Sequence, residues 1–322
     1  MSSAKRLSRL PSAGYTLEDI CDIHLIQFMP MAATQASDMP ADWNGKIPTQ
    51  IFIEEATRIL KAASDARVPL KMLGGLAIKI HSLNEEEFAR RLKRSAQPGQ
   101  EYSDLDFATY YKSRDGVRKV MESLGYSKRP STMSTAASQR QIYFHPKGWF
   151  YIDVFWDLLK AANHPISFRD RLAIDPVSIP LSDLLLEKLQ IVSFSQKDLL
   201  DTLLLLKAHN VAEEERAETV STGRIASVLS RNWGFWYTAT TNLHGLQKHV
   251  NKMSELTSKE SSELSSKIEK ILDGVNSAPK SLRWKLRSIT GNRKKWYSPV
   301  ETEESVGGFG IWRLREETSP DR

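Results

Sequence analysis

Two aspartates interrupt an apolar, aromatic run at residues 101–111, EYSDLDFATYY, and this acid pair constrains the fold more than any other feature of the sequence. Asp104 and Asp106 flank one leucine, and a strand buried on both faces would not tolerate them unpaired. On a strand, residues i and i+2 point to the same side. The run therefore predicts a strand with both carboxylates on one face and with Leu105 and Phe107 turned to a core on the other.

The acid pair predicts a metal site, because like charges this close raise each other's pKa unless a cation neutralises them. Mg²⁺ prefers oxygen ligands and often takes one or two protein carboxylates together with substrate phosphates. A third acid, Asp153, interrupts the apolar run FYIDVFWD in the same way. If the two strands are neighbours, three acids can hold two ions for an in-line displacement at phosphorus. The alternatives are a solvated edge strand for the pair and a salt-bridged core acid for Asp153.

Two glycines, Gly74 and Gly75, separate a strand expected from Val68 from the start of a helix. Glycine lets the backbone approach a phosphate closely, and the free N–H groups at a helix N-terminus favour anions. An ordinary turn between a strand and a helix would use the same residues. The order of features, in which the glycines precede the acid pair and the third acid follows, is more specific than any one of them.

This ordered set resembles the nucleotidyltransferase superfamily, which has the polymerase-β-like fold. The resemblance covers roughly residues 50–210. The matching motifs are LGGLA (73–77), DLD (104–106) and IDVF (152–155).

The sequence is most similar to AbiEii-type and related nucleotidyltransferase-like proteins, because SQKDLLD (195–201) looks like their later K-D-x-x-D helix. Two departures from that group are present. A long charged stretch, 84–100, separates the glycines from Asp104, and EYS replaces the Arg-x-Thr lead-in of the group.

The resemblance implies transfer of a nucleoside monophosphate from an NTP such as ATP to an acceptor hydroxyl, with pyrophosphate leaving. It implies two Mg²⁺ or Mn²⁺ ions bound by Asp104 and Asp106. Asp153 would ligate the catalytic ion and help to deprotonate the acceptor. Gly74 and Gly75 would hold the triphosphate.

Four further residues are implied near the nucleotide. Lys188 and Lys197 would reach the triphosphate, and Asp198 and Asp201 would be accessory residues. A structural interpretation competes with this one, because Ser195 looks like a helix N-cap and acids in a first helical turn stabilise the helix dipole.

The order of strand-like and helix-like segments predicts an α+β fold, with a small mixed sheet followed by a helical domain. We expect an irregular extension at 1–48, a catalytic domain at 49–178, a helical domain at 179–300 and a tail at 301–322. The single cysteine excludes an internal disulfide and favours a reducing, cytoplasmic setting. We find no secretory signal and no apolar run of membrane-spanning length, so no membrane partner is expected.

The basic stretch 280–297 mixes Arg and Lys with aromatic residues, and the whole chain carries a net charge of +6. Basic side chains can neutralise phosphates while aromatic rings stack on bases. An amphipathic helix that packs Trp284 and Leu286 on the domain is the alternative.

Three functions therefore compete. The first is an active nucleotidyltransferase whose acceptor is tRNA or another RNA, a protein hydroxyl, or a small molecule such as an aminoglycoside. The second is a catalytically silent nucleotide-binding or RNA-binding regulator of the toxin–antitoxin type. The third is a nucleic-acid-binding protein that acts through its basic C-terminal stretch.

Overall fold

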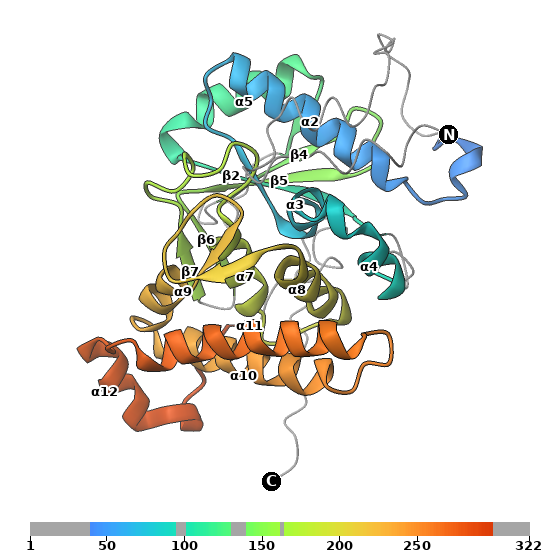
Figure 1. Cartoon of the computed structure of the whole chain (residues 1–322). Coiled ribbons are helices and arrows are strands. Elements are labelled where there is room, and N and C mark those ends of the chain that lie inside the picture. Colours follow the sequence, from blue (N-terminus) through green and yellow to red (C-terminus); the bar gives the residue numbers. More distant parts are fainter. Residues whose placement is uncertain (1–38, 95–100, 130–139, 162–163, 299–322) are drawn as a thin grey trace.

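The computed structural model describes residues 39–94, 101–129, 140–161 and 164–298 (Figure 1). The expected tail and most of the expected N-terminal extension lie outside these residues. The described part contains helices, a mixed five-stranded sheet and two small two-stranded sheets, so the predicted α+β class is confirmed.

The central sheet has its acid-bearing strand near the middle. β2 pairs with β5 in parallel, and all the other neighbours pair antiparallel. The strands, in their order across the sheet, are β1 (Lys71–Leu73), β2 (Asp104–Thr109), β5 (Tyr151–Trp156), β4 (Arg140–Phe144) and β3 (Ser127–Lys128).

One face of the sheet is covered by α2 (Thr49–Asp65) and α5 (Arg114–Ser123), which lie above it in Figure 1. The apolar residues of α2 recur every three or four positions, and this places them on one buried stripe. The helix α5 ends just before Gly125, which adopts a left-handed φ of 86°.

On the other side, α3 (Gly74–His81) follows β1 directly and contacts both α7 (Leu181–Leu189) and α8 (Gln196–Ala208). The short α4 (Glu86–Arg91) also packs on α8. One continuous cluster of buried apolar side chains includes residues of the sheet and of these helices.

A backbone segment close to the expected domain boundary pairs with the outer edge of β1. Met72 N–H donates to Val177 O at 3.0 Å, and Ile179 N–H donates to Met72 O at 2.9 Å. The proposed boundary at 178 therefore falls within backbone that is hydrogen-bonded to the sheet.

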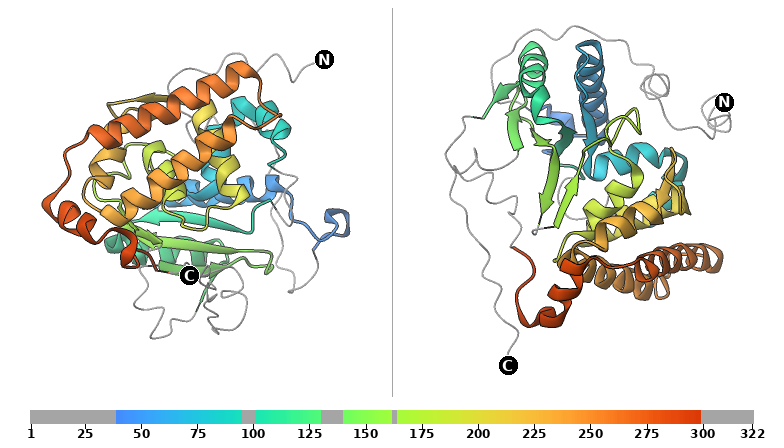
Figure 2. Two further views of the ribbon diagram at one scale, coloured as in Figure 1. Left: turned by 90° about the horizontal axis from the view of Figure 1, so that it is seen from below. Right: turned by 90° about the vertical axis from the view of Figure 1, so that its left-hand side faces the viewer.

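The remaining helices are α9 (Thr222–Leu229), α10 (Trp233–Val250), α11 (Ser258–Ser277) and α12 (Leu282–Thr290). Figure 2 shows α10 and α11 side by side along one end of the molecule. In the described part, no helix combines the length and the apolar character needed to cross a bilayer.

The helix α12 docks through fewer side chains than the amphipathic alternative required. Trp284 packs edge-on against Trp236 with ring centroids 5.1 Å apart. Leu286, in contrast, is 61% exposed, so its expected packing is wrong. The helix therefore packs on α10 through Trp284 and leaves Leu286 exposed.

Several short elements were not predicted. They are too short for a periodic pattern to identify them. The strands are β6 (Leu158–Ala161), β7 (His164–Ser167), β8 (Asn210–Ala212) and β9 (Thr219–Ser221), and short 3-10 helices span Ala41–Trp43, Leu83–Glu85, Tyr111–Ser113 and Gly291–Arg293.

Candidate functional site

The strand aspartates lie on neighbouring parallel strands. Asp106 of β2 is directly opposite Asp153 of β5, and Asp104 is opposite Tyr151. Residues opposite each other in a ladder point to the same face of the sheet. The predicted adjacency of the two strands is confirmed, and the metal-binding roles of the three acids stay a prediction.

Asp106 is at the centre of a cluster of negative charge. Burial raises its pKa well above the ordinary value, and the charges of Asp104, Asp153 and Glu187 raise it further. The nearby Lys188 acts in the opposite direction. Four carboxylates therefore gather at this point on the sheet, one more than the sequence predicted.

The fourth carboxylate, Glu187, comes from α7, and its Oε2 accepts a hydrogen bond from Gly74 N–H at 3.0 Å. Burial raises the pKa of Glu187 to about 7, against the opposing effects of Lys188 and of the Gly74 N–H. A backbone donor that was predicted to hold phosphate is thus bonded to a carboxylate in this structure. The only sequence signal for Glu187 is an acid that follows a run of leucines.

The two glycines are required by close approaches to acids. Gly74 has a left-handed φ of 84°, and a Cβ there would lie 2.9 Å from Asp106 Oδ2. A Cβ at Gly75 would lie 2.8 Å from Asp201 Oδ2. The start of α3 can therefore lie close to the acid cluster only because it lacks side chains.

Replacing Gly74 with alanine is expected to lower any transfer activity more than about a hundredfold, because the new methyl group must displace the Asp106 carboxylate. The left-handed φ adds about 1–2 kcal/mol of strain. Gly148→Ala is the matched control, since Gly148 has a φ of 68° and open space where the Cβ would lie. Urea unfolding should show a similar backbone penalty in both variants. Equal activity of the two variants would show that the close approach to Asp106 is unimportant.

Asp153 is buried and paired with a cation. Arg140 of β4 donates from Nη1 to Asp153 Oδ2 at 3.0 Å. The salt-bridged alternative considered for this acid therefore describes its contact in the structure. Sequence reasoning missed Arg140 because the register of β4 against β5, which brings it near Asp153, is not visible in the sequence.

Asp104 is held by two hydroxyl groups. Ser103 Oγ donates to Asp104 Oδ1 at 3.1 Å, and the Tyr151 hydroxyl is also hydrogen-bonded to this carboxylate. Burial, together with Asp104, raises the pKa of Tyr151, which keeps its hydroxyl a donor. These contacts fix the orientation of Asp104 at the start of β2.

A buried ionic network lies behind the glycines. Lys188 Nζ is 3.2 Å from Asp198 Oδ1 and 3.0 Å from Asp201 Oδ2. Arg94 pairs with the same Asp201 at 2.6 Å, and both side chains are almost completely buried. Burial alone would lower the pKa of Lys188, but the carboxylates around it raise the pKa. Arg94 belongs to the charged stretch 84–100 and was not predicted to be part of the site.

The N-terminus of α8 fits the structural interpretation of its acids. Ser195 caps the helix, and Asp198 returns a hydrogen bond to the Ser195 backbone in a capping box. Lys197 lies half-buried in the same first turn. The structure thus places Asp198 and Asp201 in contact with Lys188, and it gives both acids structural partners.

A second cluster of ligand-type side chains lies elsewhere in the described part. Ligand atoms of His81, Asp175 and Glu218 lie within 4.8 Å of one another. The two ring nitrogens of His81 are each 2.9 Å from a partner, Glu218 Oε1 and Ser178 Oγ. His209 Nδ1 is also 3.2 Å from Glu218. These contacts form a network that ties the end of α3 to the segment before β9.

Comparison with known proteins gives little guidance. No known protein family matches the sequence, and no curated protein matches it. One solved structure, that of the antibiotic-resistance factor ANT(2'')-Ia, is similar with a TM-score of 0.33 and 13% identity. The match covers 64% of this chain and all of that one. No comparison supports the AbiEii-type likeness, so the site is interpreted from its own geometry.

Proposed function

We propose that this protein is a metal-dependent nucleotidyltransferase that moves a nucleoside monophosphate from an NTP to an acceptor hydroxyl. One observation carries the proposal: Asp104, Asp106, Asp153 and Glu187 converge from two parallel strands and α7 beside the glycine-rich start of α3. Such a concentration of carboxylates is costly unless a cation joins it. A helix N-terminus next to it favours a phosphate.

The donor set suits a hard divalent cation, because all four groups offer carboxylate oxygens. Asp106 also lies among the negative charges of the other three carboxylates. Asp104 and Asp106 would hold Mg²⁺ or Mn²⁺, with Asp153 as a further ligand. When bound, such ions would neutralise this charge and polarise the phosphate that is transferred. We propose two ions, as the resemblance implies.

Residues of the chain itself would position the nucleotide. Gly74 and Gly75 present the backbone of α3 to the triphosphate, and Glu187 releases the Gly74 N–H when phosphate takes its place. Lys188 of α7 and Lys197 of α8 would contact the triphosphate from the helical part. In this arrangement residues 49–178 bind the nucleotide and residues 179–300 form the second wall of the nucleotide site. We propose a cytoplasmic location for the protein.

A second candidate is a catalytically silent regulator that binds a nucleotide or RNA, as in toxin–antitoxin pairs. The ion pair between Arg140 and Asp153 favours it, because an arginine already neutralises the third carboxylate. A transferase would need Arg140 to release Asp153 when metal binds. The two candidates therefore differ in whether group transfer occurs at all.

Transfer can be tested by incubating the protein with Mg²⁺ and each α-labelled NTP, together with tRNA, cell protein and aminoglycosides. We expect label in one of these acceptor pools, and none after EDTA treatment or in an Asp104→Asn variant. The labelled pool identifies the acceptor class. NTP binding without label in any pool would instead support the silent regulator.

A further inference from the structure

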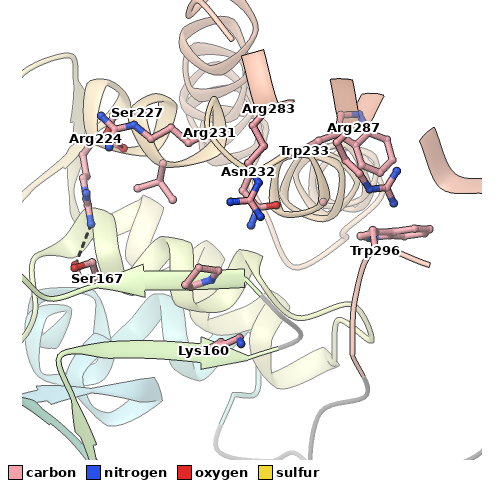
Figure 3. Close-up of a pocket in the computed structure, with 13 residues that line it drawn as sticks. Lys160, Ser167, Arg224, Ser227, Arg231, Asn232, Trp233, Arg283, Arg287 and Trp296 are labelled. Carbon is pink, nitrogen blue, oxygen red and sulfur yellow. Dashed lines mark hydrogen bonds between the residues drawn. The ribbon is translucent and has the colours of Figure 1, made fainter. Parts of the chain in front are cut away.

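A basic cavity of about 610 Å³ lies between the β6–β7 hairpin, α9, the start of α10 and α12 (Figure 3). It is formed by segments that are far apart in the sequence. Among the described residues that line it, none is acidic. The cationic residues of the lining are Lys160, Arg224, Arg231, Arg283 and Arg287.

Most of this positive charge has no carboxylate partner among the residues that the structure describes. Arg224 pairs with Asp183 at 2.9 Å, so its charge is compensated. Lys160, Arg231 and Arg283 form no ion pair with any of the described residues. Figure 3 shows Lys160 on the strand side of the cavity and the two arginines on the helix side. A ligand between them would be contacted by cations from opposite walls.

Two tryptophans give the same cavity a rigid aromatic side. The Arg287 guanidinium lies over the Trp233 ring, 4.7 Å from its centroid. Trp296 donates from Nε1 to Thr238 Oγ1 at 3.0 Å and packs edge-on against Tyr237. Trp296 is therefore held in place and stays partly accessible, so that a base can stack on its ring.

The N-terminus of α10 adds a further preference for anions. Asn232 caps the helix by accepting from Phe235 N–H, and Trp233 and Gly234 of the first turn line the cavity. The positive end of an 18-residue helix dipole therefore faces the same space as the unpaired arginines.

We propose that this cavity binds the phosphodiester backbone of a single-stranded nucleic acid. Several cations on separate walls suit successive phosphates, and the tryptophan surface suits a base, which an acidic peptide would not supply. The cavity is built on the hairpin that continues from β5 and does not include the strand acids. The role of the bound nucleic acid as the acceptor rests on the proposed transferase activity. Binding of the nucleic acid does not depend on that activity.

The test measures binding of fluorescein-labelled oligouridylate and oligodeoxythymidylate by anisotropy over a series of salt concentrations. The double variant Arg231→Glu/Arg283→Glu is expected to bind at least about tenfold more weakly at moderate salt. The slope of log K against log salt should be smaller in magnitude by about 1 to 2, because two phosphate contacts are lost. The better-bound strand identifies the ligand as RNA or DNA.

Lys285→Glu is the matched control, because Lys285 is exposed on the same helix as Arg283 but does not line the cavity. It should leave the affinity within about twofold. The proposal would be overturned if Lys285→Glu weakened binding as much as the double variant does. It would also be overturned if the protein did not bind the oligonucleotides at low salt, or if polyglutamate competed equally well. Asp106→Asn should bind the strand normally, so failure of the transferase proposal is distinguishable from failure of this one.

Discussion

Replacing Asp106 with asparagine is expected to abolish nucleotidyl transfer and to stabilise the metal-free protein. Several kcal/mol of charge stabilisation depends on the metal-binding acids, so transfer should fall at least about a thousandfold. Stability should rise because one of four clustered carboxylates becomes neutral. For a chain of this size, each kcal/mol gained raises the unfolding temperature by about 2–4 °C.

The stabilisation should depend on pH in a defined direction. The pKa of Asp106 is higher in the folded than in the unfolded protein, so the folded protein keeps this proton at pH values where the unfolded chain has lost it. The wild-type protein therefore loses stability as pH rises through that interval. The gain in Asp106→Asn should be small in acid and complete above the folded pKa. Thermal unfolding at a series of pH values measures it.

Asp65→Asn is the control for this substitution, because Asp65 lies exposed at the end of α2, away from the acid cluster. It should change neither transfer nor the response to Mg²⁺. Mg²⁺ should stabilise the wild-type protein more than Asp106→Asn. If Asp106→Asn unfolded the protein, or left transfer intact, Asp106 would be a structural acid and the proposed metal site would be wrong.

The strands of the site were predictable because they follow a period of two. Leu105 and Phe107 are buried while Asp104 and Asp106 are not fully buried, as alternation in DLDF requires. Asp153 was recognised in a similar way, as an acid that interrupts an apolar run, and its strand lies beside β2 in the structure. A strand pattern contains enough local information to say which side chains share a face, although it does not say what covers that face.

The residues that cover the acids could not be predicted, because they come from distant parts of the chain. Glu187 meets Gly74 across 113 residues of sequence, and Arg94 meets Asp201 across 107. In the sequence, Arg94 is one cation in a charged stretch that looks solvated. Only the packing of α4 and α8 around α3 turns it into a buried partner.

The lysine expected at the triphosphate illustrates the same limit. Lys188 follows a leucine-rich run, and the sequence shows a cation near the site without showing which acids hold it. In the structure two carboxylates hold it, Asp198 from a capping box and Asp201 from the next turn of α8. The helix cap was visible from Ser195 alone, because capping depends on residues that are neighbours in the sequence.

Replacing Asp201 with alanine is expected to destabilise the protein by about 3–5 kcal/mol, because Arg94 would remain as a buried charge without its partner. Asp198→Ala is the matched control on the same helix. It removes a capping acid that Lys188 also contacts, and should cost only about 1 kcal/mol. Urea unfolding with a common slope distinguishes the two values.

The origin of the loss can be isolated with a second substitution. Arg94→Met removes the stranded charge while keeping apolar contact with the Tyr102 ring, over which Arg94 lies. Arg94→Met/Asp201→Ala should therefore be more stable than Asp201→Ala alone. Additive losses in the double variant would mean that the two side chains do not act as a pair. Recovery would show that Arg94 and Asp201 stabilise the fold as a pair, so that Asp201 has a structural role behind the glycines.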